Sequence, residues 1–349
     1  MARKLARIVR VDAIRPIEGA DAIEAAVVGG WVVVVKKGDF TPGALAVYFE
    51  IDSFLPEGNA SWQFLVDKQP RVFEGRRGHV LRTLKLRGQV SQGLLLGLGA
   101  LDGTDLDRAS LAPGDEVTLA LGVQKFEPPV PAELGGVARG AFPSGVPRTD
   151  QERIQNLAEA LAEWQALGDS GALHWEVTEK LEGTSITFAL LEGALHVCSR
   201  NLDLVERPES TPWRLARALD LEAKLLALEP GRSLAIQGEL VGHGIQGNPY
   251  ALQAQRFFVF DVWDLDRASY LGPDARRDLC ARLGIEHVPV LDPRATLGRE
   301  STMEALLARA DGESALRKGQ PREGVVWKAL ERVASWKAVS NRYLLKHGG

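Results

Sequence analysis

The first 125 residues contain short strand-like runs, some alternating between apolar and polar residues (as over Ala6–Ile14) and others β-branched and apolar (as over Ala25–Lys36), and turn residues separate the runs. The predicted strands are Ala6–Ile14, Ala25–Lys36, Ala44–Ile51, His79–Leu86, Gly93–Leu98 and Glu116–Leu121. Short strands with glycine-rich turns and little helix predict a small closed β-barrel.

Basic residues gather in one part of this region. Seven Lys and Arg residues and one acid, Glu74, lie between Lys68 and Arg87. A solvated surface is the ordinary explanation of such a run. An OB-like barrel gives it a second explanation, because these barrels commonly present a basic face to nucleic acid, although a barrel without a ligand fits the same pattern. We predict an OB-like nucleic-acid-binding domain over residues 1–125. Its predicted contacts are Lys36, Arg76, Arg82, Lys85 and Arg87.

A change in composition separates this region from the rest of the chain. Glu127–Thr149 holds five prolines and four glycines, so residues 126–149 are predicted to be a linker. The pattern then becomes mixed. The predicted helices begin at Thr149 or Asp150 (to about Leu167) and at Thr211 (to about Leu228), with two more over 273–283 and 301–310. The predicted strands are Trp175–Lys180, Thr184–Glu192, Ala194–Arg200, Ser233–Val241, Arg256–Leu265 and Gly324–Ala329. We therefore predict an α+β domain with antiparallel sheets over residues 150–349.

The bulk properties exclude several classes of protein. A chain of 349 residues with 45% hydrophobic and 25% charged residues is typical of a two-domain globular protein. No apolar run is long enough to predict a membrane span. The two cysteines, Cys198 and Cys280, have no metal-ligand spacing, which predicts a reducing, cytoplasmic setting and no zinc site. The net charge of −4 does not by itself indicate a nucleic-acid-binding protein, and we expect a monomer.

Lys180 is the residue with the most specific chemical context. It ends a predicted strand, and Gly183 follows three residues later, as a nucleotide-carrying lysine requires. The pattern alone is weak, because Lys85 and Gly88 reproduce it within the predicted barrel. An isolated lysine at a strand edge is usually a solvated charge. The rest of the chain has to supply the partners of such a nucleophile.

Four later segments carry those partners. Glu239 and Glu323 each lie beside a glycine in an apolar strand, and Phe258 and Phe260 lie in an aromatic strand that can stack on a base. Lys337 lies in a last strand, Ser335–Val339. A triphosphate needs a metal held by carboxylates and cations at its phosphates. Each residue alone would more often be a surface or core position, but their joint order favours a nucleotidyltransferase.

In this order the segments resemble the nucleotidyltransferase domain of covalent polynucleotide ligases and capping enzymes. Glu179-Lys180, Gly238–Gly242, Phe258–Asp261 and Glu323–Val326 are similar to ATP-dependent RNA ligases. Ile17–Asp21, Glu50–Pro56 and Leu86–Gly93 are similar to the nick-sealing RNA ligase family, often called family five, in which an OB domain precedes the catalytic domain.

The resemblance implies an ATP-dependent RNA ligase that repairs RNA, with Mg²⁺ or Mn²⁺ as cofactor and RNA or RNA/DNA nicked duplexes as partners. Lys180 would carry AMP, and Lys337 would contact the α-phosphate. Glu182, Glu239 and Glu323 would hold the metal or the ribose. Phe260, or else Phe258, would stack on adenine, and Glu179 or its backbone would read the adenine amino group. The implied ATP contacts are completed by Gly183, Ser185, Arg200 and Arg153, with Arg148 as a further phosphate contact.

One position departs from the family pattern. RNA ligases of this type commonly carry two lysines, one residue apart, in the last motif, but Val339 occupies the second position. Arg342 or Lys346 could supply the missing cation.

Three alternatives have less support. Gly242–Gly247 matches the dinucleotide fingerprint G-x-G-x-x-G, but Asn248-Pro249-Tyr250 follows where a helix is needed. DNA ligases and GTP-using capping enzymes append an OB domain after the catalytic domain, and this sequence carries it before. A non-catalytic nucleic-acid-binding protein would be expected to lack the motif lysines, whereas Lys180 and Lys337 are both present.

Overall fold

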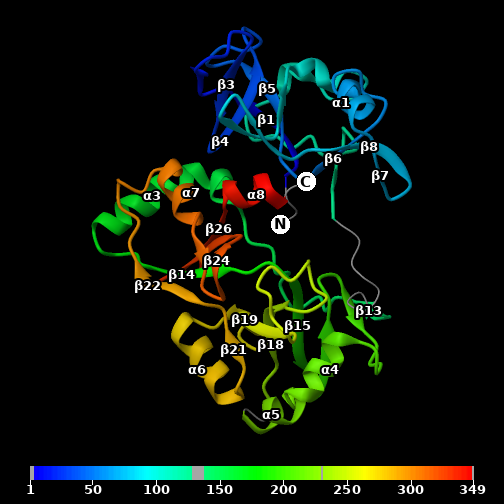
Figure 1. The fold of residues 1–349 in the computed structure, drawn as a ribbon, viewed down its shortest axis with the longest axis vertical. Helices are drawn as coiled ribbons and strands as arrows, with labels where there is room; N and C mark the ends of the chain where they lie inside the picture. Colours follow the sequence, from blue (N-terminus) through cyan, green and yellow to red (C-terminus); the bar gives the residue numbers. More distant parts are fainter. Residues whose placement is uncertain (1–3, 128–136, 229–230, 348–349) are drawn as a thin grey trace. The chain divides into compact units, whose positions relative to one another are not determined.

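The computed structural model describes residues 4–127, 137–228 and 231–347 (Figure 1). The chain folds into two compact units, and neither unit is continuous in sequence. The N-terminal unit comprises Met1–Pro128, Glu152–Ala162 and Asn341–Gly349, and the C-terminal unit comprises Pro129–Gln151 and Glu163–Ser340. Part of the predicted linker, residues 128–136, lies outside the described residues.

Short strands dominate the N-terminal unit. They are β1 (Ala6–Arg10), β2 (Ala13–Pro16), β3 (Ile23–Val28), β4 (Trp31–Lys36), β5 (Leu45–Phe49), β6 (Ser53–Pro56), β7 (Arg71–Phe73), β8 (Arg76–Val80), β9 (Thr83–Leu86), β10 (Gln89–Gln92), β11 (Leu94–Leu96) and β12 (Gln124–Lys125). Their sheets have the orders β1-β5-β11, β2-β3-β4, β9-β10 and β12-β6-β8-β7. The helices of this unit are α1 (Gln63–Lys68), η1 (Leu98–Leu101), η2 (Arg108–Ser110), η3 (Ile154–Leu157) and α8 (Asn341–His347).

Strand β5 is buried on both faces and so separates two hydrophobic cores. Val47 and Phe49 point into a core that contains Trp62. Tyr48 points into the other, with Trp31. Successive side chains of a strand point to opposite faces, which explains this division. Leu344 of α8 packs against the core of Trp31, so the last helix belongs to the N-terminal unit.

Two predicted strands of this unit differ in the structure. The run Ala25–Lys36 is a hairpin, β3 and β4, because Gly29 adopts a positive φ of 58° and turns the chain. The strand predicted over 116–121 is wrong: one isolated bridge joins Arg7 to Glu116, and a turn follows. That turn buries Val117 and Leu121 together in the core of Trp62, and their apolar side chains produced the strand-like pattern.

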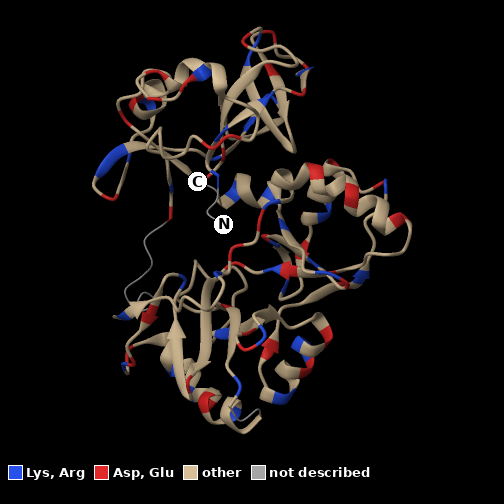
Figure 2. Cartoon of the chain, turned by 180° about the vertical axis from the view of Figure 1, so that it is seen from behind, with Lys and Arg blue, Asp and Glu red and all other residues tan. Residues whose placement is uncertain are grey.

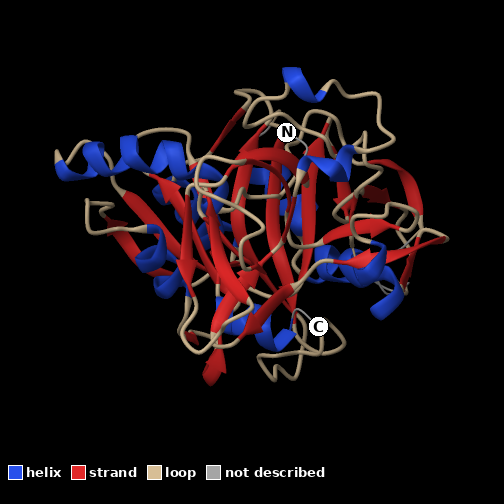
Figure 3. Ribbon diagram, turned by 90° about the horizontal axis from the view of Figure 1, so that it is seen from above, coloured by secondary structure: helices blue, strands red, loops and turns tan. Residues whose placement is uncertain are grey.

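The C-terminal unit contains two main antiparallel sheets (Figure 3). The larger sheet is formed by β13 (Ala138–Ala141), β17 (Leu202–Leu204), β16 (Ala194–Cys198), β15 (Thr184–Leu191), β18 (Leu234–Val241), β19 (Arg256–Asp264) and β20 (Ser269–Tyr270), with β21 (Glu286–His287) parallel to β19. The second sheet is formed by β22 (Val290–Ala295), β14 (Trp175–Lys180), β25 (Gly324–Ala329) and β26 (Ser335–Val339). A small hairpin pairs β23 (Glu313–Ser314) with β24 (Arg317–Pro321).

Tryptophans fix the orientation of the second sheet. Trp175 of β14 packs edge-on against Trp327 of β25 and Trp336 of β26, and these two stack with centroids 4.8 Å apart. All three are fully buried. Alternation along β14 therefore sends Glu176, Thr178 and Lys180 to the opposite face.

The helices expected after residue 149 depart from prediction at two places. The helix expected over 211–228 is two helices, α4 (Thr211–Ala218) and α5 (Leu221–Leu228), because Asp220 adopts a positive φ of 50° between them. The helix expected from Thr149 or Asp150 begins as η3 at Ile154 and continues as α3 (Ala158–Asp169). Neither expected cap residue caps it. The Thr149 hydroxyl lies 2.9 Å from that of Ser185, and Asp150 binds Arg200.

The remaining helices are α6 (Pro273–Leu283), as predicted, and α7 (Met303–Ala310), which Thr302 caps through the Ala305 N–H. Within the described residues, no helix is long and apolar enough to cross a membrane.

Candidate active site

Lys180 lies at the end of β14, in the middle of the second sheet. It is in register with Gly324 of β25, which is in register with Val339 of β26. One pair further along, Thr178 aligns with Val326 and Val326 with Lys337. Residues in register on antiparallel strands point to the same face. Lys180 and Lys337 therefore share the face that the tryptophans leave uncovered.

Glu323 is the direct partner of Lys180. Its Oε1 accepts a hydrogen bond from Nζ at 2.5 Å. The side chains are 25% and 16% exposed, so the pair is held at a surface that solutes can reach. The structure brings these two predicted residues together from strands 143 positions apart.

Glu239 reaches the same place from the larger sheet. It lies in β18, in register with Ser185 of β15 and Phe258 of β19. Burial raises the pKa of its carboxyl to about 8, and the neighbouring Glu323 carboxylate adds to the rise. Lys180, Arg200 and the Gly183 N–H oppose the rise. A carboxyl in this position favours a proton or a bound cation.

Gly183 allows the close approach of β18. A Cβ on it would lie 2.3 Å from the Leu240 carbonyl oxygen and 3.0 Å from Cγ of Glu239. No L side chain fits there without moving the strand. The glycine of the motif thus sets the spacing between the nucleophile and Glu239.

The loops around the site supply residues that the sequence did not reveal. The Tyr250 hydroxyl accepts a hydrogen bond from the Glu182 N–H at 2.6 Å. Burial raises the pKa of this phenol, and the carboxylates of Glu323, Glu179 and Glu182 add to the effect. Asp150 holds the Arg200 guanidinium at 2.6 and 2.7 Å. The turn at Asn248–Tyr250 was interpreted only as chain reversal, so nothing in the pattern singled out Tyr250.

The two aromatic candidates occupy different environments. Phe258 is 3% exposed and packs with Leu181, Val241 and Tyr250. Phe260 lies at a β-bulge, where β19 gains one residue opposite β18, and it is only partly buried. A base needs an open ring face, so the structure favours Phe260 over Phe258 as the stacking residue.

Lys328 joins the two sheets behind Phe260. Its Nζ lies 2.7 Å from Asp261 and 5.8 Å from the centre of the Phe260 ring, and it also donates to the Phe260 carbonyl. Burial lowers the pKa of this lysine to about 8, while Asp261 opposes the change. On the same face, Glu176 is in register with Lys328 and binds Arg276 and Arg277. This buried charged cluster was not predicted.

Glu179 points to the opposite face of β14 from Lys180. Its Oε2 accepts from the Ala315 N–H at 2.8 Å, and its Oε1 has no hydrogen-bond partner within the described residues. Burial raises the pKa of this carboxyl. Arg322 lies close enough to oppose that rise.

The remaining phosphate candidates are placed as follows. The Arg148 guanidinium donates to the Arg200 carbonyl at 3.2 Å. Arg153 belongs to the N-terminal unit, where it is 6% exposed and binds Asp52 at 3.1 Å. Arg342 and Lys346 lie on α8 of the same unit. Val339 is 4% exposed and in register with Gly324, which is in register with Lys180. A lysine at position 339 would therefore point to the same face of the sheet as Lys180.

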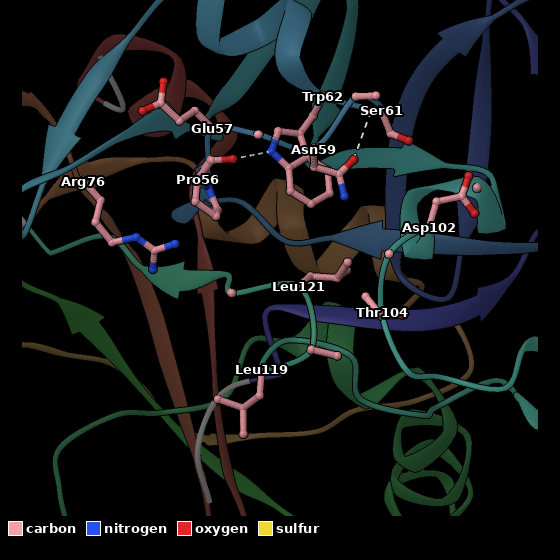
Figure 4. A pocket seen from close by; sticks show the side chains of 16 residues that line it. Pro56, Glu57, Asn59, Ser61, Trp62, Arg76, Asp102, Thr104, Leu119 and Leu121 are labelled. Atoms are coloured by element: carbon pink, nitrogen blue, oxygen red, sulfur yellow. Dashed lines mark hydrogen bonds between the residues drawn. The ribbon is translucent and has the colours of Figure 1, made fainter.

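The predicted nucleic-acid contacts all lie in the N-terminal unit. Lys36, Arg76, Lys85 and Arg87 are exposed, and Arg82 is half-buried. Blue segments on the β7–β8 hairpin mark part of this basic run in Figure 2. Arg76 also lines a pocket of about 710 Å³ beside Trp62 and Leu121 (Figure 4). The Trp62 N–H in that pocket donates to the Pro56 carbonyl, and Arg76 contributes a positive charge to the lining.

The described residues contain no preformed group of three or more His, Cys, Asp or Glu side chains that could hold a metal. Two of the predicted metal ligands, Glu239 and Glu323, are nevertheless near each other, because the Glu323 carboxylate contributes to the raised pKa of Glu239. Mg²⁺ and Mn²⁺ at nucleotide sites commonly use one or two carboxylates together with phosphate oxygens and water. The donor set fits that mode of binding.

Comparisons with known proteins agree with this architecture. A sequence model of the RNA ligase family matches residues 173–346, and one of an OB-fold domain matches residues 5–98. Solved structures of Naegleria gruberi RNA ligase are 43% identical to the chain. An apo variant has a TM-score of 0.91 and covers 99% of this chain and 98% of its own. Variants with ATP and Mn and with AMP and Mn have TM-scores of 0.90 and 0.91, and each covers 99% of both chains. Among curated proteins, a sequence search returned no match.

Proposed function

The chain belongs to the RNA ligase family and is an ATP-dependent RNA ligase, and from that premise we propose that Lys180 is its covalent AMP carrier. The observation that carries the proposal is the position of the Lys180 amine. It lies at the open face of the second sheet, 2.5 Å from Glu323 and close to Glu239. Lys85, which has the same sequence pattern, lacks these neighbours.

The proposed reaction has three steps. The Lys180 amine attacks the α-phosphorus of ATP, an N–P bond forms, and pyrophosphate leaves. A terminal 5′-phosphate oxygen then attacks the AMP phosphorus, the N–P bond breaks, and the lysine is regenerated. Finally a 3′-hydroxyl attacks the activated 5′-phosphorus, and AMP leaves as the strands join. Each step is a phosphoryl or nucleotidyl transfer that depends on positioning and on stabilisation of charge.

Several residues support the first step. The amine must lose a proton to attack, and the Glu323 oxygen that accepts its hydrogen bond is placed to receive that proton. Lys337 shares the face of Lys180 and would stabilise negative charge at the α-phosphate. The partly exposed ring of Phe260 would stack on adenine. Glu182, Glu239 and Glu323 would hold Mg²⁺ or Mn²⁺, which supplies charge neutralisation at the phosphates.

The adduct can be tested with α-labelled ATP and a divalent metal. We expect acid-labile label on the wild-type protein and none on Lys180→Ala, with Lys180→Arg as a variant that keeps the charge. Label from GTP alone would redirect the assignment to a capping activity. A folded wild-type protein that forms no adduct with either nucleotide would refute the covalent mechanism.

We further propose that the substrate is a nick in a duplex, with RNA at the 3′-hydroxyl end. The exposed cations of the N-terminal unit support this, because sequence-tolerant phosphate contacts suit a continuous duplex. The test compares sealing of a nicked duplex with sealing of the same strands unannealed. Equal rates on both would argue against nick specificity.

A further inference from the structure

A second basic site lies in the N-terminal unit, apart from the catalytic residues, and includes Arg82 of the predicted nucleic-acid contacts. A cavity of about 230 Å³ opens between the segment after α1, strands β7 to β9 and helix α8. Its polar lining comes from Gln69, Arg71, His79, Arg82 and Thr83. All of these segments belong to the same compact unit.

The two arginines of the cavity form no ion pair within the part of the chain that the structure describes. Within the described residues, neither Arg71 nor Arg82 makes a hydrogen bond or an ion pair with another side chain. They are close enough that Arg71, after burial, lowers the pKa of Arg82. Asp52 is the acid that acts on Arg82, and it is already bound to Arg153 at 3.1 Å. Two like charges held near a single carboxylate that already binds Arg153 leave a demand for an anion.

Two further polar residues, Thr83 and His79, line the cavity. The Thr83 hydroxyl is buried and has no hydrogen-bond partner within the described residues. Buried hydroxyls of this kind are rare in proteins, because the lost hydrogen bonds with water cost free energy. His79 Nδ1 contacts the Gln69 carbonyl at 3.0 Å, so Nδ1 carries a proton. Nε2 is an acceptor in the neutral ring and becomes a donor only when the ring is protonated. Burial lowers the pKa of His79, and Arg82 and Arg71 lower it further. A bound anion would reverse the effect of the two arginines.

We propose that Arg71, His79, Arg82 and Thr83 form a pocket for one phosphate group of the nucleic-acid strand. The assignment of the phosphate to nucleic acid rests on the proposed function of the protein as an RNA-joining enzyme. Arginine pairs bind phosphate through several charge-assisted hydrogen bonds. The Thr83 hydroxyl would add one more, and His79 would add another in the protonated form that a bound anion favours.

The rim of the cavity favours a nucleotide over a free ion. Leu84 and Leu345 line the cavity and are 55% and 37% exposed. Apolar groups of this kind gain nothing from inorganic phosphate, but they can cover a ribose or a base. Lys85 and Arg87 follow on the same hairpin and would continue the contact along the strand.

The test measures binding of a nicked RNA duplex to the full chain as a function of salt. We expect Arg71→Ala to lower the affinity about tenfold and to reduce the slope of log K against log salt by about one. Arg82→Ala should act similarly. Because the two arginines repel each other, each substitution should leave the unfolding midpoint equal or higher. Arg77→Ala is the matched control: it removes the same charge from the same hairpin, but Arg77 is paired with Glu57 at 2.9 Å. Its affinity should change less than about twofold.

The outcomes separate the sources of the phosphate. A second experiment follows the NMR signals of the His79 ring, which are assigned with His79→Gln. The protein is titrated with nicked RNA and, separately, with inorganic phosphate alone at constant ionic strength. Shifts that saturate with nicked RNA and are lost in Arg71→Ala support the proposal. If inorganic phosphate saturates the pocket at micromolar concentration while Arg71→Ala binds RNA normally, the pocket is a free-anion site and the proposal fails. If the arginine variants lose stability together with affinity, the arginines are structural and the proposal also fails. Failure of the wild type to form the lysine adduct would refute the catalytic proposal alone, whatever the arginine variants do.

Discussion

The pattern of a lysine followed three residues later by a glycine occurs in both units, and the copies at Lys180 and Lys85 have different surroundings. Lys180 ends a central strand and pairs with Glu323. The backbone of β18 occupies the space in which a Cβ on Gly183 would lie. Lys85 lies exposed on the β9–β10 hairpin, and no atom lies within 4 Å of a Cβ built on Gly88. Arg87 and Gly88 both have positive φ, as a two-residue hairpin turn requires.

The same spacing from lysine to glycine therefore serves two physical purposes. In the catalytic unit the glycine allows two strands to approach, so the lysine meets carboxylates. In the N-terminal unit the glycine reverses the chain and leaves the lysine in solvent. Charge differs in the same sense at these two places: Lys180 is paired with Glu323, whereas within the described residues Arg71 and Arg82 form no ion pair.

The largest expected difference between the two copies is chemical. Lys180→Ala should lower formation of the AMP adduct at least about 10⁴-fold, since the nucleophile is gone. Lys85→Ala should retain the adduct. Quench-flow labelling with α-labelled ATP measures both rates. Loss of the adduct in Lys85→Ala and its retention in Lys180→Ala would reverse the assignment.

Replacement of the two glycines tests their separate purposes. Gly183→Ala should lower the free energy of unfolding by about 3 kcal/mol, because the new methyl group meets the Leu240 carbonyl oxygen at 2.3 Å. Gly88→Ala should cost only about 1 kcal/mol, the strain of positive φ in open space. Denaturant unfolding provides both values. Similar losses for the two variants would mean that the approach of β18 does not depend on Gly183.

The carboxyl groups beside Lys180 predict that the free energy of unfolding depends on pH, and the surroundings of Lys85 predict no such dependence. The pKa of Glu239 is about 8 in the folded chain and near 4.5 when unfolded, so the folded state retains a proton through this window. As pH rises from about 4.5 to about 8, Glu239 ionises in the unfolded chain but keeps its proton in the folded chain, so the free energy of unfolding falls. Glu239→Gln should remove that decline and unfold with a free energy about 1–2 kcal/mol higher at pH 8, with little difference at pH 4.5. A stability difference that is constant with pH would contradict the shift. These measurements are made without metal or nucleotide.

The smallest expected effect belongs to Lys85 itself. As one exposed phosphate contact, Lys85→Ala should weaken binding of nicked RNA about two- to fivefold and lower the salt slope by no more than about one. Fluorescence anisotropy at several salt concentrations measures both quantities. An affinity that does not change at low salt would remove Lys85 from the binding surface.

Local patterns predicted much of the fold. Strand β14 and helix α6 have the predicted bounds, and β25 does as well, because their apolar periodicity and their bounding glycine or proline agree with the final structure. The two-unit α+β architecture was also predicted. The strand predicted over 116–121 was wrong, because a local turn replaces it. The single helix predicted over 211–228 was wrong, because the positive φ of Asp220 divides it.

The site could be predicted only in part. Motif order predicted that Lys180, Glu239 and Glu323 would come together, and register and burial bring them together. Tyr250, Lys328 and the Asp150–Arg200 pair act through long-range contacts that leave no periodic trace in the sequence. Their roles depend on which loops meet.

The return of the last helix to the N-terminal unit bears on how the protein is made. Leu344 fills part of the core around Trp31, and Ile154 is buried in the same unit. The domain that leaves the ribosome first is therefore completed last, after the whole catalytic unit has been synthesised. A nascent chain that stops short of α8 lacks the Leu344 side chain in the core around Trp31, so complete packing of the N-terminal unit waits for the synthesis of α8.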